Sequence, residues 1–416
     1  MQKVLFIAYL YPPLNCGVCR QSKISKYLPS CGWMPLVLSV KKSRLRPRYD
    51  ESLLKDTESI TVCRTFSFES RILMRGIPRL LNINPKYLQI PDPFIGWLPF
   101  AVAHGLTLIR KENIEAIFST SMPNTSHLIA LILKKMTKLP WLADFREAWT
   151  QNPFVSYPAP VFSVENMMEA AVMRNADAIT VINDPIRIGL EAKYPNELHK
   201  FVTISHGFDP DDFHRTKRTL SQEFTILYAG SLYGRRSAEA FLKVLKKAVE
   251  ENGELRGNVR IHFVGDVKSA QKVIEKLNLT DIVTLSGYVS HEKIFENMVR
   301  ADLLLLIIGA EKDDDKISTG KLFEYMGSGT PVLAVAPPGA AAEVVEKAQI
   351  GIVVHPNDEN EIKKTILRLY QEYKEKKLRA TPNKKVVEQY DVRNLSEKVA
   401  TVLDTITKNS RSNKGD

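Results

Sequence analysis

The fold is decided by the stretch Ser318-Thr-Gly-Lys-Leu-Phe-Glu-Tyr-Met-Gly-Ser-Gly-Thr-Pro-Val-Leu333. Its first three residues are of helix-capping type, and the next six predict about two turns of helix. Gly327 and Gly329 are expected to end this helix, because glycine takes the left-handed conformation at little cost. The apolar run Val332 to Ala336 has the composition of a buried strand. The stretch therefore predicts a loop, a short helix and a buried strand in succession.

The start of this helix is predicted to bind an anion. Backbone N–H groups and the positive end of the helix dipole favour a phosphate there. Lys321 lies in the first turn, where a lysine is unfavourable for the dipole unless an anion is present. Glu324 follows too late to form a capping box with Ser318 or Thr319. An ordinary surface pair between Lys321 and Glu324 is the alternative interpretation.

Length and composition predict a globular protein of two or three domains, since 416 residues include 44% hydrophobic and 25% charged ones. No apolar run reaches roughly 18 residues, so no membrane span is expected. The apolar start of the chain predicts a buried strand rather than a signal segment, because Pro12 and Pro13 follow it. All four cysteines precede residue 64, and we expect thiols in a reducing, cytoplasmic compartment. A redox pair of Cys16 and Cys19 is the alternative, and zinc is not expected.

The net charge of +11 suits nucleic acid, an anionic membrane surface or small phosphorylated ligands. One basic cluster runs from Lys41 to Arg48, and a second, from Lys363 to Lys385, is mixed with acidic residues as on a solvated helix face. No RNA-recognition signature or zinc finger is present, so nucleic acid is not an expected partner. The basic and apolar run Arg71 to Leu81 indicates either a packed surface loop or an excursion that faces a membrane or an acceptor.

Strands and helices alternate through the first half of the chain, which predicts a parallel sheet covered by helices. No Gly-x-Gly-x-x-Gly fingerprint follows the first strand, so NAD binding has no direct support. Residues 66–100 are less regular. The expected strands are 3–10, 34–40, 116–120, 140–144, 178–182 and 201–204, with helices at 20–28, 99–111, 127–136, 161–175 and 184–193.

A polar, turn-rich segment from Ser205 to Arg218 separates this half from a second alternation of strands and helices. The predicted fold class is therefore α/β, with two Rossmann-like, doubly wound domains facing each other across a cleft. We place the domains at 1–208 and 209–387, a helix packing back toward the first domain at 388–407, and a disordered tail at 408–416. The expected strands of the second half are 225–229, 259–264, 283–286, 303–308, 332–335 and 351–354.

Polar side chains follow the strands of the first half. Asp144, Arg146 and Glu147 lie at the end of one predicted strand. The carboxyl ends of parallel strands line the crevice where such sheets bind ligands, so these residues are candidates for a site there. His127 and His206 are interpreted as structural.

A second polar group follows the first strand of the second half. Gly230 begins a turn, and Arg235 and Arg236 stand at the start of the next helix. Guanidinium groups bind phosphate oxygens in a bidentate geometry, although two solvated arginines on a loop are the alternative. Lys321 lies at the end of a later strand of the same sheet, so these cations are expected to converge on one crevice and hold a diphosphate.

Four groups of residues, in this order and spacing, resemble motifs of family 4 glycosyltransferases, which are retaining enzymes of the two-domain GT-B type. The resemblance covers roughly residues 1–405 and is closest to members that build surface polysaccharides. The motifs are Tyr11-Pro-Pro with Gly17, Arg20, Lys26-Tyr-Leu and Gly32-Trp-x-Pro; Asp144-Phe-Arg-Glu-Ala-Trp149; Gly230-Ser-Leu-Tyr; and Gly320-Lys-Leu-Phe-Glu-Tyr-Met with Gly329-Thr-Pro-Val-Leu.

The resemblance implies roles for individual residues. Glu324 would accept hydrogen bonds from the ribose, and Arg236 and Lys321 would hold the diphosphate, with Arg235 as a helper. Tyr288 and Val289 would lie near the base, and the loop around Gly17 would approach the donor phosphates and the acceptor. Asp144 and Arg146 would orient the acceptor or the sugar. The remaining donor-binding candidates are Gly230, Ser231, Gly320 and Leu322.

Two departures from the family pattern affect these roles. Ser231 replaces the usual arginine after the turn glycine, and Lys316 stands where the first of two glutamates normally contacts the donor sugar. Asp314, Asp315 or a different contact would then hold the sugar. The run Asp313 to Asp315 is interpreted as a solvated loop, and no metal site or cofactor is expected. Three cations and a helix dipole can offset the charge of the leaving diphosphate without a metal.

The expected function is transfer of a sugar, with retention, from a UDP- or GDP-linked donor to a glycan or lipid-linked acceptor. The amino-terminal domain would bind the acceptor and the carboxyl-terminal domain the nucleotide sugar. The protein is expected in the cytoplasm, peripherally on the inner face of the membrane, with residues 41–81 on an anionic surface. The alternative is a non-catalytic, two-lobed protein that binds a nucleotide or a glycan, which the lysine at position 316 favours.

Overall fold

The computed structural model describes residues 1–14, 19–42, 49–68, 77–82, 85–213, 222–232 and 236–412. These residues form two compact units, of which one comprises Met1–Ser205 with Val392–Asp416 and the other His206–Asp391. The sequence placed the corresponding boundaries after residues 208 and 387. Within the described ranges, no helix has both the length and the apolar character that a membrane span requires.

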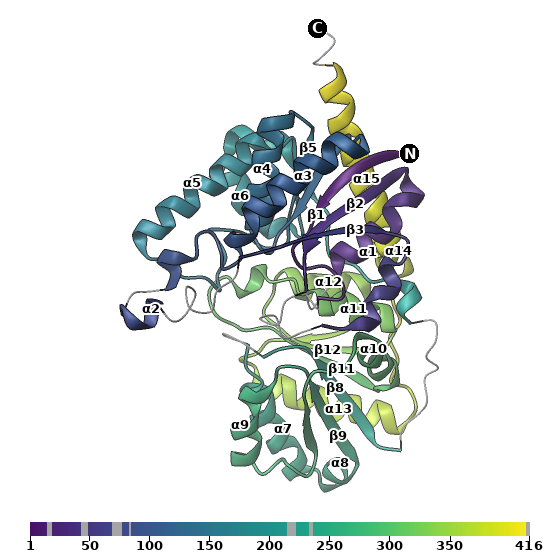
Figure 1. Ribbon diagram of the computed structural model, residues 1–416. Helices are drawn as coiled ribbons and strands as arrows, with labels where there is room; N and C mark the ends of the chain where they lie inside the picture. The colour runs from purple at the N-terminus through teal and green to yellow at the C-terminus, as the bar shows by residue number, and fades with distance from the viewer. Residues whose placement is uncertain are drawn as a thin grey trace. The chain divides into compact units, whose positions relative to one another are not determined.

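The amino-terminal unit is built on a seven-stranded parallel sheet in the order β3-β2-β1-β4-β5-β6-β7 (Figure 1). Its strands are β1 (Gln2–Ile7), β2 (Trp33–Val40), β3 (Thr61–Thr65), β4 (Ala116–Thr120), β5 (Trp141–Phe145), β6 (Ala178–Val181) and β7 (Phe201–Thr203). Its α-helices are α1 (Arg20–Tyr27), α2 (Ile77–Leu80), α3 (Leu98–Glu112), α4 (Thr125–Thr137), α5 (Ala159–Asn175), α6 (Asp184–Lys193) and α15 (Val392–Ser412).

The carboxyl-terminal unit repeats this plan with a six-stranded parallel sheet in the order β10-β9-β8-β11-β12-β13. Its strands are β8 (Phe224–Ala229), β9 (Val259–Val264), β10 (Val283–Ser286), β11 (Leu303–Ile307), β12 (Val332–Val335) and β13 (Gly351–Val354). Its α-helices are α7 (Glu239–Glu251), α8 (Gly253–Asn258), α9 (Gln271–Lys276), α10 (His291–Arg300), α11 (Gly320–Ser328), α12 (Ala340–Ala348), α13 (Glu359–Lys374) and α14 (Lys384–Glu388). Both strand orders are those of a doubly wound fold, which confirms the predicted fold class.

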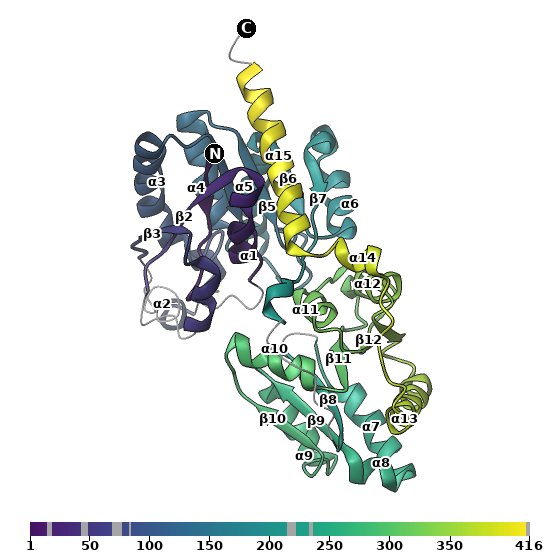
Figure 2. The same ribbon diagram turned by 90° about the vertical axis from the view of Figure 1, so that its right-hand side faces the viewer.

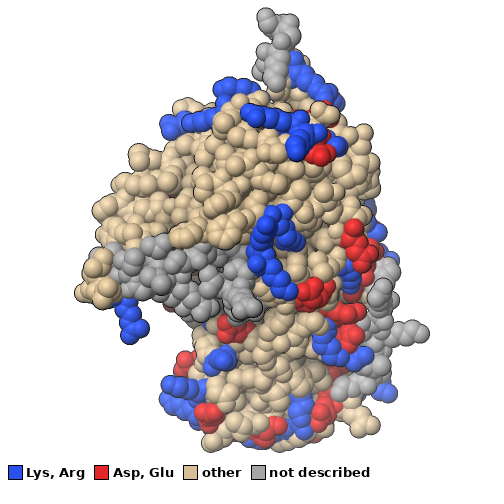
Figure 3. Space-filling model, in the orientation of Figure 1, with Lys and Arg blue, Asp and Glu red and all other residues tan. Residues whose placement is uncertain are grey.

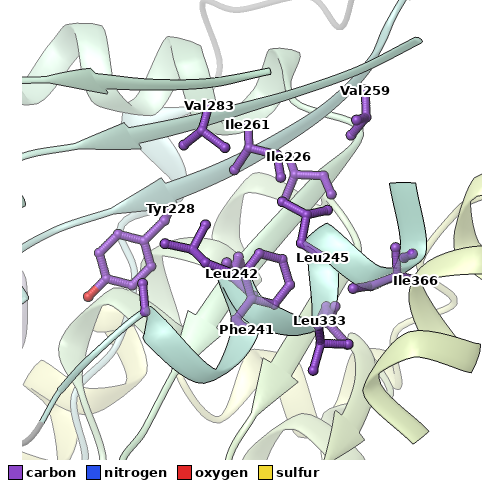
Figure 4. Packing of buried hydrophobic residues seen from close by; sticks show 14 of the residues in the cluster. Ile226, Tyr228, Phe241, Leu242, Leu245, Val259, Ile261, Val283, Leu333 and Ile366 are labelled. Atoms are coloured by element: carbon purple, nitrogen blue, oxygen red, sulfur yellow. The ribbon is translucent and has the colours of Figure 1, made fainter. Parts of the chain in front are cut away.

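Each sheet is covered on both faces, because alternate residues of its central strands enter different apolar clusters. Ile226 and Tyr228 of β8 pack with α7 and α13, whereas Leu227 and Ala229 pack with α10, α11 and α12. Figure 4 shows the first of these clusters, with the Tyr228 ring at its end and the hydroxyl pointing away from the other labelled side chains. Strands buried on both faces require nearly continuous apolar sequence, which is why the central strands were readily predicted.

Charged residues of the carboxyl-terminal unit lie intermixed on the face shown in Figure 3. Three lysines of the unit pair with glutamates between α13 and the helices beside it: Lys247 with Glu359, Lys363 with Glu251, and Lys374 with Glu254. The lysine-rich helix therefore has the solvated, mixed-charge surface that its sequence predicted.

Three sequence expectations about the elements were wrong. The edge strand β3, Thr61–Thr65, was not predicted, because three of its five residues are only half-buried and its run is short. Gly327 lies inside α11 rather than at its end: a Cβ there would come within 2.5 Å of the Phe213 ring and 2.7 Å of the Phe208 ring. Helix α15 continues to Ser412, so residues 408–412 are not disordered, and residues 413–416 lie outside the described ranges.

Helix α15 is part of the core of the amino-terminal unit. It packs on α1 and β5, as Figure 2 shows. Val399, Leu403 and Ile406 belong to the cluster that also contains residues of β1 and β2. The Trp33 indole donates a hydrogen bond to Asp404 at 3.0 Å, and Arg411 forms an ion pair with Glu115. The last helix of the chain therefore completes the fold of its first unit.

We expect Leu403→Ala to destabilise the amino-terminal unit by about 2–5 kcal/mol, because it leaves a cavity at a fully buried position. All four tryptophans lie in this unit, so tryptophan fluorescence during urea unfolding reports on it alone. Thr405→Ala, at an exposed position of the same helix, is the control. Equal unfolding midpoints for the two variants would show that α15 does not contribute to this core.

Candidate functional site

The order of strands in the carboxyl-terminal unit reverses between β8 and β11. The chain proceeds outward from β8 to β9 and β10, and then returns to the other side of β8 with β11. Ligands of doubly wound sheets bind outside the carboxyl ends of the strands at such a point. Gly230 directly follows β8, and α11 follows β11, so both predicted phosphate-binding elements start at this place.

Two glycines allow close approach of the backbone at the end of β8. The Gly230 amide donates to the carbonyl of Val264 at 2.8 Å, beyond the last pair of the β8–β9 ladder. Gly265 has a φ of +125°, and a Cβ there would lie 2.3 Å from the Gly230 carbonyl oxygen. Gly230 has a φ of +132°, and a Cβ there would lie 2.6 Å from the ammonium nitrogen of Lys321. Any larger residue at either position would displace the loops or the lysine.

Helix α11 is fixed to both central strands by Tyr325. Its buried hydroxyl accepts a hydrogen bond from the Ala229 amide at 2.8 Å and donates one to the Leu305 carbonyl at 3.2 Å. Burial raises the pKa of this phenol, which therefore stays neutral and able to donate. Thr319 is the N-cap residue and makes no side-chain capping hydrogen bond. The helix therefore presents its first turn, with backbone N–H groups, beside the end of β8.

Lys321 is buried in that first turn, with only 8% of its surface exposed. Its ammonium donates to the Tyr228 hydroxyl at 2.8 Å and lies 4.1 Å from the centre of that ring. Burial, followed by the nearby Arg236 guanidinium, lowers the pKa of Lys321 to about 7, while Glu324 acts in the opposite direction. The lysine points to β8 rather than to Glu324, so the alternative of an ordinary surface pair is wrong.

Arg236 and Glu324 lie near this ammonium, close enough to influence its charge. Both side chains are half-buried. The structure thus brings together Gly230, Arg236, Gly320, Lys321 and Glu324 at the end of β8. Two cations and a helix start in one place form an arrangement suited to a phosphate or diphosphate.

Other predicted donor-binding residues have different surroundings. Leu322 is fully buried in the apolar cluster beside α11, which leaves its side chain no surface for a ligand. The carbonyl of Ser231 accepts a hydrogen bond from the Tyr228 hydroxyl at 3.1 Å. Tyr288 is half exposed after β10, and Val289 packs partly against the α11 cluster. Gly17 and Arg235 lie outside the described residues.

In the amino-terminal unit, Asp144 lies inside β5 and has a structural environment. It forms an ion pair with Arg20 at 3.0 Å and accepts hydrogen bonds from the Thr120 and Thr180 hydroxyls, each at 2.8 Å. Burial alone would raise the pKa of this carboxyl, but the Arg20 guanidinium and these hydrogen bonds hold it below its usual value. With 1% of its surface exposed, Asp144 is better placed to position other groups than to touch a substrate.

Arg146, which directly follows β5, is held by the same unit. Its guanidinium donates to the Gln21 side chain at 3.0 Å and to the Ser121 carbonyl. The Glu147 carboxylate accepts from the Asn152 amide at 2.7 Å. His127 is buried, stacks on Phe145 and bonds Ser119 at 2.8 Å; burial lowers the pKa of His127 to about 3. A neutral, packed imidazole agrees with the structural interpretation of His127.

The acidic loop before α11 is partly internal. Asp314 is 1% exposed and accepts a hydrogen bond from the Glu311 amide at 2.9 Å, so it fixes the loop. Lys316 is exposed and forms an ion pair with Asp313 at 2.6 Å. Asp315 is exposed, whereas its backbone packs against Gly339, where a Cβ would lie 2.3 Å from the Asp315 carbonyl oxygen. Of the two aspartates suggested as substitutes for a sugar-binding glutamate, Asp315 is the accessible one.

Sequence reasoning assigned no role to Tyr228 or Tyr325. The Tyr325 hydroxyl bonds the last amide of β8, and the Tyr228 hydroxyl bonds Lys321. A buried tyrosine requires a partner for its hydroxyl. That requirement was the available signal, although the partners lie at positions that only the tertiary structure brings close. Arg20 was quoted only as part of a motif, without its role as the partner of Asp144.

The two doubly wound units and a cation site at the strand reversal define a two-domain α/β protein of the GT-B class. Residues 223–372 match the family model described as glycosyl transferases group 1, which covers most of the carboxyl-terminal unit. A comparison with curated proteins finds no significant match. The family match and the fold together support a GT-B glycosyltransferase.

Solved structures resemble the whole chain. Sucrose-phosphate synthase from Thermosynechococcus elongatus has a TM-score of 0.69 at 15% identity, covering 97% of this chain and 99% of that one. Anabaena HepE with UDP and glucose has a TM-score of 0.69 at 15% identity, covering 97% and 100%. A glycosyltransferase from Rickettsia africae has a TM-score of 0.67 at 15% identity, covering 98% and 99%. At such identities the likeness concerns the fold.

We expect Asp144→Asn to destabilise the amino-terminal unit by about 3–5 kcal/mol, because Arg20 would keep a buried charge without its counter-ion. Asp144 has a lowered pKa, so its contribution is present above the unfolded value near 4 and is lost as the pH falls through the folded value. The difference between wild type and variant in urea unfolding, followed by tryptophan fluorescence, should therefore be constant above about pH 5 and shrink below pH 4.

Glu191→Gln is the matched control, because Glu191 pairs with Arg187 at 2.8 Å on the surface of the same unit. Its effect should stay within about 0.5 kcal/mol. A stability difference for Asp144→Asn that is equally small, or one that grows toward acid, would contradict the structural role of the Arg20–Asp144 pair.

Proposed function

We propose that the protein is a retaining, metal-independent glycosyltransferase of family 4. It transfers a sugar from a UDP- or GDP-linked donor to a glycan or lipid-linked acceptor, in the synthesis of surface polysaccharide. The carboxyl-terminal unit binds the donor and the amino-terminal unit binds the acceptor. The observation that carries the proposal is the buried ammonium of Lys321 beside Arg236, at the start of α11 and the end of β8.

The energetics of this ammonium favour an anionic ligand. A buried lysine loses hydration, and a neighbouring guanidinium opposes its charge further. Within the described part of the chain, its hydrogen bond goes to the neutral phenol of Tyr228. A diphosphate would bring negative charge beside Lys321 and Arg236, and the first-turn N–H groups of α11 would bind its oxygens. HepE, which has the same fold, was crystallised with UDP-glucose.

The same groups suit the chemistry of sugar transfer. In the transition state, the bond from the sugar's anomeric carbon to the diphosphate breaks, and negative charge develops on the leaving oxygen. Lys321, Arg236 and the helix dipole stabilise that charge. The acceptor hydroxyl attacks from the face that the diphosphate leaves, and its proton passes to a phosphate oxygen. Retention then follows without a covalent enzyme intermediate, and Glu324 holds the ribose.

We expect Lys321→Ala and Arg236→Ala to weaken binding of UDP or GDP about 10- to 100-fold, because each removes a charge-assisted contact to the diphosphate. The same variants should bind the corresponding nucleoside as wild type does. Glu324→Ala should weaken binding of both nucleoside and nucleotide, because its proposed contact is to the ribose. Isothermal titration with UDP, GDP and ADP, and with their nucleosides, measures these affinities.

Lys347→Ala is the control, since Lys347 is an exposed residue of α12 and pairs with Glu343 at 2.8 Å. Wild-type affinity for the nucleotide in both Arg236→Ala and Glu324→Ala would refute the site assignment. Turnover is tested by a screen of nucleotide-sugar donors with product detection by mass. Nucleotide binding without product from any donor would favour the non-catalytic alternative.

The proposed membrane partner concerns the amino-terminal unit. Several large apolar side chains are exposed on α2 and its following residue and just after the end of β3. Exposed apolar patches can mark membrane interaction sites. Leu80 and Leu81 expose 83% and 60% of their surface, and Phe66 and Phe68 expose 53% and 58%. Arg79 is exposed next to them, and the chain carries an excess of 11 positive charges. Apolar anchors beside basic groups favour an anionic lipid surface.

We expect the protein to sediment with anionic lipid vesicles at low salt and to be released as the salt concentration rises, because ions screen the electrostatic part of the attraction. Replacing both Leu80 and Leu81 by Asp should abolish this binding. Ile188→Asp, which alters a side chain 57% exposed on α6, is the control. Absence of wild-type sedimentation at low salt would refute the membrane contact. An equal loss of vesicle binding in Ile188→Asp would refute the assignment of that contact to Leu80 and Leu81.

A further inference from the structure

We propose that Tyr228 is a positioning residue for the diphosphate site: its phenol holds the Lys321 ammonium above Gly230, where the donor's diphosphate binds. The inference rests on the proposed function, because it assigns a task to Tyr228 only if Lys321 binds the diphosphate. It goes beyond that function by naming a residue that contacts the lysine, and that need not contact the donor.

Tyr228 and Lys321 meet at the end of β8 although they come from different faces of the sheet. Tyr228 and Lys321 belong to opposite faces of the sheet, since the Tyr228 ring lies in the cluster with α7 whereas α11 packs on the other face. They meet beyond the end of β8, where Gly230 has no side chain. Lys321 thus crosses the end of the strand, with its nitrogen 2.8 Å from the phenol oxygen. Figure 4 shows the hydroxyl of Tyr228 directed out of the apolar cluster.

The Tyr228 hydroxyl accepts the hydrogen bond from Lys321. The Tyr228 hydroxyl donates its proton to the Ser231 carbonyl at 3.1 Å. Its oxygen lone pairs are then left to accept from Lys321, so the phenol favours the charged form of the amine. The ring adds a cation–π contact at 4.1 Å. Both contacts stabilise an ammonium at this position against the cost of burial and against the charge of Arg236.

Binding of the diphosphate is coupled to protonation of Lys321. Among the residues that the structure describes, the charged groups that face Lys321 are Arg236, from the loop after β8, and Glu324, on α11 itself. Tyr228 of β8 is the titratable group that contacts it there. Because the pKa of Lys321 is lowered to about 7, part of the unliganded protein carries a neutral amine near neutral pH. A bound diphosphate favours the ammonium, so binding takes up a proton and weakens as the pH rises.

The test is Tyr228→Phe, which keeps the ring and removes the acceptor. Isothermal titration with UDP and GDP between pH 6 and 9 should show an affinity lowered about 3- to 10-fold at neutral pH. The pH at which affinity begins to fall should move downward, because the ammonium has lost a hydrogen bond. Titration in two buffers of different ionisation enthalpy counts the protons taken up, and this number should rise at pH 7 in the variant.

Tyr370→Phe is a closely matched control. Tyr370 is a buried tyrosine of the same cluster, and its hydroxyl accepts from the Asn258 side chain at 3.1 Å and donates to the Glu254 carbonyl at 3.4 Å. The control loses the same kind of hydrogen bonds at a place with no proposed ligand. It should change stability as Tyr228→Phe does and leave both the nucleotide affinity and its pH profile unchanged.

A second variant tests the same position without altering the tyrosine. Gly230→Ala would put a Cβ 2.6 Å from the Lys321 nitrogen and should displace the ammonium, lowering nucleotide affinity at least 10-fold. Gly329→Ala is its control, because Gly329 also has a positive φ, of +69°, but has open space around it. Both substitutions put an alanine at a positive φ, but of the two only Gly230→Ala places a Cβ against the Lys321 nitrogen.

The outcomes are distinguishable. If wild type binds no nucleoside diphosphate, or Lys321→Ala binds as wild type does, the proposed function fails. If Lys321→Ala weakens binding but Tyr228→Phe matches Tyr370→Phe in affinity and pH profile, the positioning role is overturned while the proposed function stands. If Tyr228→Phe does not fold, equal affinities of Gly230→Ala and Gly329→Ala overturn it instead.

Discussion

The hydrogen bonds of the Tyr325 hydroxyl hold the carboxyl-terminal unit together at the place where its strand order reverses. One bond reaches the last amide of β8 and the other a carbonyl of β11. Strands on either side of a reversal continue into separate loops. A helix that is bonded to both strands therefore determines the spacing between those loops. Lys321 precedes Tyr325 by one helical turn and lies on the same side of α11. The position of the ammonium is therefore a consequence of how the helix is attached to the sheet.

The attachment of α11 to the sheet brings Lys321 beside groups that lower the free-energy cost of burying its ammonium. An ammonium transferred from water into a protein interior carries a large desolvation cost unless polar groups replace its water. At the end of β8 the replacements are the Tyr228 oxygen and ring face. They are neutral, so they lower the cost without cancelling the charge. The positive potential of the ammonium therefore remains. Together with the potentials of Arg236 and of the helix start, it can attract an external anion.

Much of the fold could be predicted from the sequence, because strands buried on both faces must be continuously apolar. The run Leu303 to Ile308 is an example, whereas the half-buried edge strand at Thr61 to Thr65 has no such run and was missed. The convergence of Gly230, Arg236 and Lys321 was predictable too, since strand order alone puts their loops at one edge. The contacts of the two tyrosines could not be predicted. The Lys321–Tyr228 contact joins residues 93 positions apart, and the Tyr325–Ala229 contact joins residues 96 positions apart. The buried surroundings of Asp144 were not predictable for the same reason, since its partner Arg20 is 124 positions away.

Comparison of Asp144 with Lys321 explains why one buried charge is structural and the other fits a ligand. Asp144 lies in the central strand β5 of its unit, and the Lys321 ammonium lies beside the end of the central strand β8 of the other unit. Asp144 faces a guanidinium and two hydroxyls, and its pKa is held low, so its charge is stabilised by the protein itself. Lys321 is near a second cation, and its pKa is lowered, so the protein disfavours its charge in the absence of a partner. A charge that the fold satisfies gains little from a ligand, whereas a charge that the fold disfavours gains most from an anion. By this criterion the carboxyl-terminal unit is the better candidate for the proposed diphosphate site.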